Sequence, residues 1–100
     1  MAAISRKGDS LTTGHICAST TTLDTPTQST VYATGELIAR KSDKTVSHAY
    51  PPSPACVPHV ANVNVGSETV YVVGLKCSRI GDSTDSGELI EGSETVFAGG

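Results

Sequence analysis

Apolar residues occur along this chain in short runs separated by turn-forming residues, without the three-to-four spacing of an amphipathic helix. The clearest runs, 31–33 and 70–73, are rich in β-branched and aromatic residues, which favour strands. Glycine follows each run closely, and turns at Thr34-Gly35 and Gly74-Leu75 fit β-hairpins. The pattern therefore predicts an all-β protein of short strands and tight turns.

These runs belong to a unit that occurs three times. The pentapeptide at 66–70 recurs unchanged at 92–96, each copy followed by an aromatic residue, and 29–32 is a weaker copy. A second element aligns without gaps at three places, with Arg and Asp three positions apart in each: 4–9, 38–43 and 77–82. The third unit is split between the two ends of the chain. We therefore expect one domain, residues 1–100, made of three pseudo-threefold-related β-hairpin repeats.

Two segments interrupt the repeat. Residues 43–60 contain four prolines, which exclude a central strand and stiffen a loop. Residues 19–28 are rich in threonine and are interpreted as a solvated connector or a sheet edge.

Composition suggests a thin core that needs support. A chain of 100 residues buries only about 60–70% of its unfolded surface, and this one has four aromatic residues and no Trp. Small folds of this kind are usually stapled by a disulfide, a metal ion or a partner chain. We expect synthesis as a soluble cytosolic product, because no apolar signal-peptide core or membrane span is present. In that compartment, an odd count of three cysteines argues against a disulfide framework.

The net charge of −3, without a basic run, argues against nucleic acid as a partner. Neither a Ser-His-Asp order, a phosphate-binding Gly loop nor a carboxylate pair for acid–base chemistry can be assembled. We therefore expect no catalytic residue, no small-molecule substrate and no enzyme activity.

All three histidines follow an Arg-Asp element. His15 is nine residues after Arg6 and His48 is eight after Arg40, whereas Cys56 and His59 lie further along the second loop. If the units surround an axis, these loops meet at one end of the molecule. Three imidazoles and one thiolate match tetrahedral zinc chemistry. The sequence therefore predicts one structural zinc ion, bound by His15, His48, Cys56 and His59.

The repeat also sorts the other cysteines. Cys77 aligns with two isoleucines and is predicted to lie in the core. Cys17 aligns with Ile90 and is interpreted as a small buried hydrophobe, with a role as ligand in place of Cys56 as the alternative. In the third loop, Ser86 stands where a ligand would be expected. Four protein ligands make a structural site, and no Glu adjoins the histidines as HExxH would require.

The repeated Arg and Asp residues have two interpretations. An Asp at a fixed offset gives each Arg a partner, so the preferred one is bracing of the loop that follows. The alternative is a binding ring of three arginines. The glutamates at 36, 68, 88 and 94 are expected to be solvated.

These features together resemble the PAAR-repeat proteins over nearly the whole chain: Arg-x-x-Asp after an Ile/Ala strand, Gly-Ser-x-Thr-Val-aromatic strands, and His/Cys loops. The Pro-Ala-Ala-Arg tetrapeptide of the family is degenerate here, at 37–40 and 76–79, so the repeat spacing carries the resemblance. The resemblance implies a small cone with zinc at its vertex, held by three His and one Cys.

The resemblance also implies a role and partners. Family members sit on the blunt end of a trimeric β-helical spike, one tip chain per trimer, and sharpen contractile phage tails or type VI secretion spikes. We expect a phage baseplate tip, located in the virion after cytosolic assembly, that contacts the target-cell outer membrane transiently. The alternatives are a secreted type VI tip or effector adaptor, and a zinc hydrolase. Candidate base residues are Leu37, Val72, Val73 and Leu75.

Overall fold

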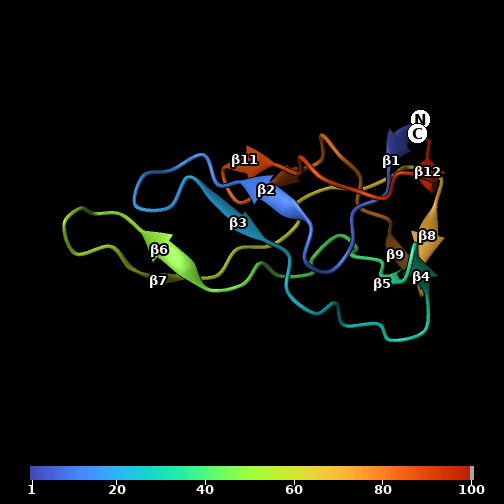
Figure 1. The fold of residues 1–100 in the computed structure, drawn as a ribbon, viewed down its shortest axis with the longest axis horizontal. Helices are drawn as coiled ribbons and strands as arrows, with labels where there is room; N and C mark the ends of the chain where they lie inside the picture. The colour runs from blue at the N-terminus through green and yellow to red at the C-terminus, as the bar shows by residue number, and fades with distance from the viewer. Residues whose placement is uncertain (100) are drawn as a thin grey trace.

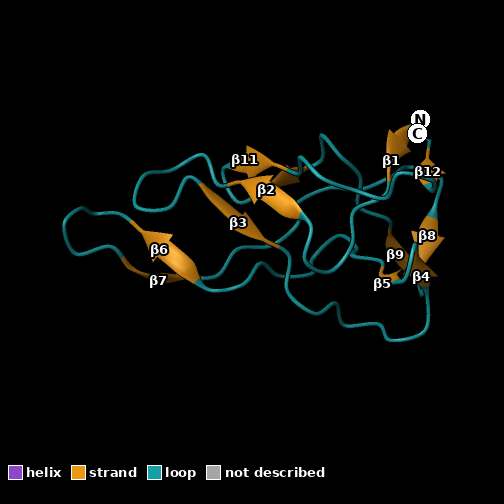
Figure 2. Cartoon of the chain, in the orientation of Figure 1, coloured by secondary structure: helices purple, strands orange, loops and turns teal. Residues whose placement is uncertain are grey.

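The computed structural model describes residues 1–99, and within them the chain forms twelve short strands and no helix. The expectation of an all-β protein is therefore confirmed. The molecule is elongated, with extents of 40 × 23 × 21 Å, and most of its length is turn or loop (Figures 1 and 2). No helix long and apolar enough to cross a bilayer occurs among these residues.

The strands pair into six two-stranded antiparallel sheets. Their bounds, in order of pairing, are β1 (Ala2–Ala3) with β12 (Phe97–Ala98), β4 (Tyr32–Ala33) with β5 (Glu36–Leu37), β8 (Tyr71–Val72) with β9 (Leu75–Lys76), β2 (Ser10–Thr12) with β3 (Thr20–Thr22), β6 (His48–Tyr50) with β7 (Val57–His59), and β10 (Ser83–Thr84) with β11 (Gly87–Glu88).

The pairs β1–β12, β4–β5 and β8–β9 gather with both termini at one end of the long axis, called here the broad end (Figure 1). Two of them are hairpins, and the third joins the two ends of the chain. The turn at Thr34-Gly35 is as predicted. The second turn is at Val73-Gly74 instead, one residue earlier than expected, because Leu75 already pairs with Val72 in β9.

Equivalent residues of the three segments form a closed ring of backbone hydrogen bonds. Ser5 N–H donates to Ser78 O, Ser78 N–H to Ala39 O, and Ala39 N–H to Ser5 O, each over 3.1 Å. Single bridges repeat the pattern, joining Ile4 to Arg79, Arg6 to Ile38 and Arg40 to Cys77. These bonds join three segments that are far apart in the sequence, and they place equivalent residues around a common pseudo-threefold axis.

Two small apolar clusters fill the interior. The cluster at the broad end comprises Ile4, Ala33, Ile38, Val72, Cys77 and Ala98. The second comprises Leu11, Leu23, Ala39, Val63 and Leu89. Cys77 is fully buried, as predicted. Leu23, Pro26 and Gln28 are buried as well, so the expectation of a solvated connector at 19–28 is wrong for these three residues.

The Arg and Asp residues brace the turns between the clusters. In each segment the Arg backbone N–H donates to the Asp carboxylate, over 2.7, 2.8 and 2.9 Å, and the guanidinium contacts the same carboxylate. Each guanidinium also donates to a carbonyl of the next segment: Ala33, Val72 or Gly99. The bracing interpretation is confirmed, and the arginines also link neighbouring segments.

The pairs β2–β3, β6–β7 and β10–β11 extend from the bracing turns toward the opposite, narrow end (Figure 1). The proline-rich segment forms the β6–β7 hairpin, which lies outermost there. Within residues 1–99 this hairpin pairs with no further strand, which suits Pro58 because proline cannot donate a ladder hydrogen bond.

Candidate metal centre

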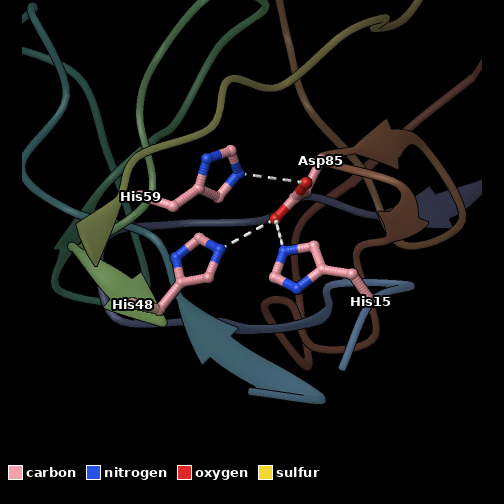
Figure 3. A group of neighbouring side chains, drawn as sticks. All are labelled: His15, His48, His59 and Asp85. Atoms are coloured by element: carbon pink, nitrogen blue, oxygen red, sulfur yellow. Dashed lines mark hydrogen bonds and ion pairs between the residues drawn. The ribbon is translucent and has the colours of Figure 1, made fainter. Parts of the chain in front are cut away.

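Four side chains converge in the half of the molecule that holds β2–β3, β6–β7 and β10–β11, and Figure 3 shows how they point toward one another. His15 lies in the β2–β3 loop, His48 begins β6, and His59 ends β7 directly opposite His48. Asp85 lies in the β10–β11 turn. Its φ of 55° is in the left-handed region, which Asp tolerates better than most residues.

The four ligand atoms all lie within 4.8 Å of one another. Nε2 of His15 and Nε2 of His48 are each 2.8 Å from Asp85 Oδ2, and Nε2 of His59 is 3.3 Å from Oδ1. The side chains of His15, His48 and Asp85 are only 8%, 4% and 5% exposed, and that of His59 is 26% exposed. Donors of tetrahedral zinc stand about 3.3 Å apart, so this group could hold a metal ion after small side-chain adjustments.

The hydrogen bonds on the far side of two rings fix their tautomers. Nδ1 of His15 is 3.0 Å from Ile16 O, and Nδ1 of His48 is 3.0 Å from Val46 O. A carbonyl oxygen can only accept, so both Nδ1 atoms carry the proton. In a neutral ring the Nε2 lone pair then faces the Asp85 carboxylate, which is also an acceptor. This arrangement requires positive charge between them, supplied by ring protons or by a cation.

A glycine allows the loop that carries His15 to reach Asp85. Gly14 has φ of 73°, and a Cβ atom there would overlap the carbonyl oxygen of Ser86. Thr13 N–H donates to Ser19 O over 2.9 Å and closes this loop at its neck. Any larger residue at position 14 would move His15 away from Asp85.

Tyr50 packs on the histidines from the β6–β7 hairpin. Its ring stacks on His59 at a centroid distance of 4.2 Å and meets His15 edge-on at 4.7 Å. The aromatic ring therefore restricts the orientations open to two of the three imidazoles.

The structure brings together three of the four predicted ligands, His15, His48 and His59, but not Cys56. The Cys56 sulfur is bonded to Cys17 in a disulfide, which leaves no thiolate for a metal ion. Asp85 occupies the fourth position in its place. Sequence reasoning placed the expected ligand position of this turn at Ser86, one residue beyond Asp85, and assigned three ligands to the second loop instead. The signal that would have found Asp85 is that it is the only ionisable residue between Asp82 and Glu88.

The disulfide also corrects two expectations about the cysteines. Cys17 is half-buried and cross-linked, rather than a small buried hydrophobe. Two of the three cysteines form the disulfide, and the third, Cys77, is a free thiol in the core. The expectation that the cysteines would not form a disulfide was wrong. The two that pair lie 39 residues apart, and they meet only when two loops fold together.

Comparison with protein-family models and with curated proteins finds no match to this chain.

The metal-free protein is expected to lose stability as the pH rises from 6 to 8. Burial lowers the pKa of His15, but hydrogen bonds to Ile16 O and Asp85 outweigh it and raise the pKa above its ordinary 6.5. A raised folded-state pKa stabilises the fold below about pH 6.5, and this contribution disappears as the pH rises through the folded-state value. Thermal melts in the presence of a chelator measure the effect.

Asp85 is expected to limit the stability of the metal-free protein at acid pH. Burial raises the pKa of Asp85, but hydrogen bonds from His48, His15 and His59 outweigh it and bring the pKa below its ordinary 3.8. Its contribution is present above about pH 3.8 and disappears as the pH falls through the folded-state value. Metal binding has the opposite slope near neutrality, because protons compete for the imidazoles. A chelated protein that gains stability from pH 6 to 8 would contradict this assignment.

Proposed function

We propose that this chain is a spike tip of the PAAR type, a metal-stiffened point that caps a trimeric β-helical spike of a contractile phage tail. The observation that carries the proposal is the threefold repetition of contacts at the broad end. A single chain normally presents an asymmetric surface, whereas equivalent residues recurring around one line can match three identical strand ends of a trimer.

The broad end also offers equivalent apolar side chains. Tyr32, Tyr71 and Phe97, called here the aromatic triad, occupy equivalent positions in β4, β8 and β12 and are 58%, 56% and 48% exposed. Each precedes a buried core residue, and side chains alternate between the faces of a strand, so the triad faces away from the core. These three strands lie at the outer edge of the broad end in Figure 1.

The residues expected at the base of the tip differ in their exposure to a spike. Val73 and Leu75, expected at the base, are exposed, and Leu37 is half-buried. Val72 is only 6% exposed and belongs to the core, so its place among the base candidates is corrected. Capping would also cover the exposed β-edges of the trimer, whose unpaired backbone groups otherwise invite unwanted pairing.

For the narrow end, we propose a structural zinc ion bound by His15, His48, His59 and Asp85. Imidazole nitrogen and carboxylate oxygen are both zinc ligands, and zinc accepts four protein ligands in structural sites. Four ligands leave no open position for a water, so this site is proposed to stiffen the point rather than to hydrolyse a substrate. The two small apolar clusters explain why such support is useful.

Binding to a spike tests the role. The chain, co-expressed with trimeric β-helical spike proteins, is expected to co-purify as one tip per trimer. Tyr71→Ala is expected to weaken binding at least tenfold, because central aromatic side chains dominate interfaces. Val57→Ala is the matched control, since Val57 is similarly exposed but lies at the narrow end. Equal losses for both variants, or no binding of the wild type, would contradict the proposal.

A second candidate is an adaptor that loads effectors onto a type VI secretion spike. Ile16, Val57 and Val60 favour it, because they are exposed apolar side chains away from the broad end. In that case Val57→Ala and Ile16→Ala, but not Tyr71→Ala, would reduce recovery of an effector in pull-downs from secreting cells.

A further inference from the structure

The disulfide has a specific position relative to the histidines. Cys17 is two residues after His15, and Cys56 is three residues before His59. The cross-link therefore joins the β2–β3 loop to the β6–β7 loop, with Cα atoms 5.6 Å apart. The two hairpins carry three of the four ligands of the metal centre, His15 in the first and His48 and His59 in the second.

The backbone hydrogen bonds near the cross-link remain within each loop. Thr13 N–H donates to Ser19 O in one loop, and Cys56 N–H donates to Pro52 O in the other. Both cysteines have left-handed backbones, with φ of 77° at Cys17 and 43° at Cys56. Residues other than glycine rarely adopt this region unless their surroundings impose it. The disulfide joins the two loops at these two residues.

We propose that the Cys17–Cys56 disulfide is a redox clamp on the His15–His48–His59–Asp85 group. In the oxidised protein the cross-link fixes the positions of His15 and His59, so the site is preorganised and holds its metal ion tightly. In the reduced protein the two loops separate more easily, and the ion exchanges faster. The clamp rests on the proposed metal centre but not on the proposed binding to a spike.

Closing the clamp is a thiol–disulfide exchange. The thiolate of one cysteine attacks a small-molecule disulfide such as oxidised glutathione, and one glutathione thiolate leaves and takes up a proton. The second cysteine, as its thiolate, attacks the sulfur of the first cysteine in the mixed disulfide, and the second glutathione leaves as a thiolate that takes up a proton. The two protein thiols lose two protons and two electrons, and the oxidant is reduced to two thiols. Cys17 and Cys56 are both half-buried, so small thiols can reach them.

The third cysteine does not take part in this exchange. Burial raises the pKa of the Cys77 thiol to about 11, and the residue is fully enclosed in the core. A thiol of this kind is mostly protonated at neutral pH and is unreactive. The redox response is therefore confined to the narrow end.

Zinc release is the test. Oxidised wild-type protein and protein reduced with a phosphine are each loaded with zinc, and zinc content and then transfer to a colorimetric chelator are measured. Reduction is expected to speed release by about 10- to 100-fold, the range for loss of groups that orient metal ligands. The Cys17→Ser/Cys56→Ser double variant is expected to release zinc at the fast rate under both conditions. Cys77→Ala, the matched control, keeps the difference between oxidised and reduced protein.

The possible outcomes distinguish a failure of the redox clamp from a failure of the proposed metal centre. No bound zinc in either state would overturn the metal centre and the clamp together. One bound zinc that leaves at the same rate in both states would overturn the clamp alone. Slower release after reduction would also overturn it and would mean that the Cys56 thiolate becomes a ligand. If the double variant does not fold, the comparison of oxidised and reduced wild type decides.

Discussion

Replacing His48 by alanine is expected to abolish stoichiometric zinc binding and to lower the melting temperature of the zinc-loaded protein by tens of degrees. His48 is the least exposed of the ligands, at 4%, and its Nδ1 is fixed by Val46 O. A three-ligand remnant binds zinc far more weakly, and structural zinc contributes on the order of 10 kcal/mol in small zinc-binding peptides. Because each 1 kcal/mol corresponds to about 4–8 °C in a domain of this size, the shift should be large.

Elemental analysis after gel filtration and thermal melts with and without chelator measure this effect. Ser47→Ala is the control, because Ser47 is the exposed neighbour of His48 and contacts none of the ligands through a side-chain hydrogen bond. The control should retain one zinc per chain and the wild-type melting temperature. Full zinc content in His48→Ala would show that the ion is bound elsewhere.

The same measurements decide between the two assignments of the fourth ligand. Asp85→Ala is expected to reduce zinc content strongly, because Asp85 lies between all three histidines. Cys56→Ser should retain zinc at equilibrium in excess metal, since its sulfur is occupied by Cys17. The reverse result would favour the thiolate predicted from the sequence over the carboxylate.

The second large effect is expected at the buried Arg40–Asp43 pair, where Asp43→Ala should destabilise the protein by about 3–5 kcal/mol. The side chains of Arg40 and Asp43 are only 5% and 2% exposed. Asp43 accepts bonds from the Arg40 backbone N–H and from the backbone and side chain of Thr27. Its removal leaves a buried guanidinium without a counter-ion, in a domain whose total stability is about 5–15 kcal/mol.

The repeat supplies matched comparisons for this variant. Asp9 and Asp82 accept the corresponding backbone N–H and guanidinium bonds, without the two bonds that Asp43 accepts from Thr27. Their partners Arg6 and Arg79 are also more exposed, at 15% and 16%. Water can therefore solvate those guanidinium groups when the carboxylate is lost, and Asp9→Ala and Asp82→Ala should cost less than Asp43→Ala. Urea denaturation of the three variants in the same buffer measures the order. Equal losses at all three positions would contradict the expectation that burial and the Thr27 bonds make Asp43 the most important of the three.

The repeated elements of the chain could be predicted because their information is local and recurs. Apolar residues next to Gly turns predicted the β4–β5 and β8–β9 hairpins, and alignment of the copies placed Cys77 in the core beside Ile4 and Ile38. The constant offset of Arg and Asp predicted the ion pairs, since three residues of a turn are enough to bring the two groups together. The error at the second turn, by one residue, is the usual uncertainty of element boundaries.

The metal centre was predicted only in part, because its ligands lie beyond the aligned Arg–Asp elements, where no repeated residue marks a ligand position. The chain has only three histidines, so the sequence could assign all of them to one metal site, and in the structure they lie together. The fourth ligand depends on the close approach of the β10–β11 turn to the loop that carries His15. Gly14 permits this approach, and no local sequence pattern predicts it. The choice of Cys56 failed because its distance from Cys17 in space is not encoded in their separation along the chain.

The sequence by itself therefore determined an all-β chain of repeated strand–turn units, the Arg–Asp braces and the three imidazoles available for a metal ion. These follow from the period of side chains along a strand and from contacts between near neighbours. Tertiary structure alone decided that Asp85 joins the histidines, that Cys17 and Cys56 are cross-linked, and that the aromatic triad is exposed at one end. Each of these depends on the approach of segments tens of residues apart, which only the closed packing of the whole chain fixes.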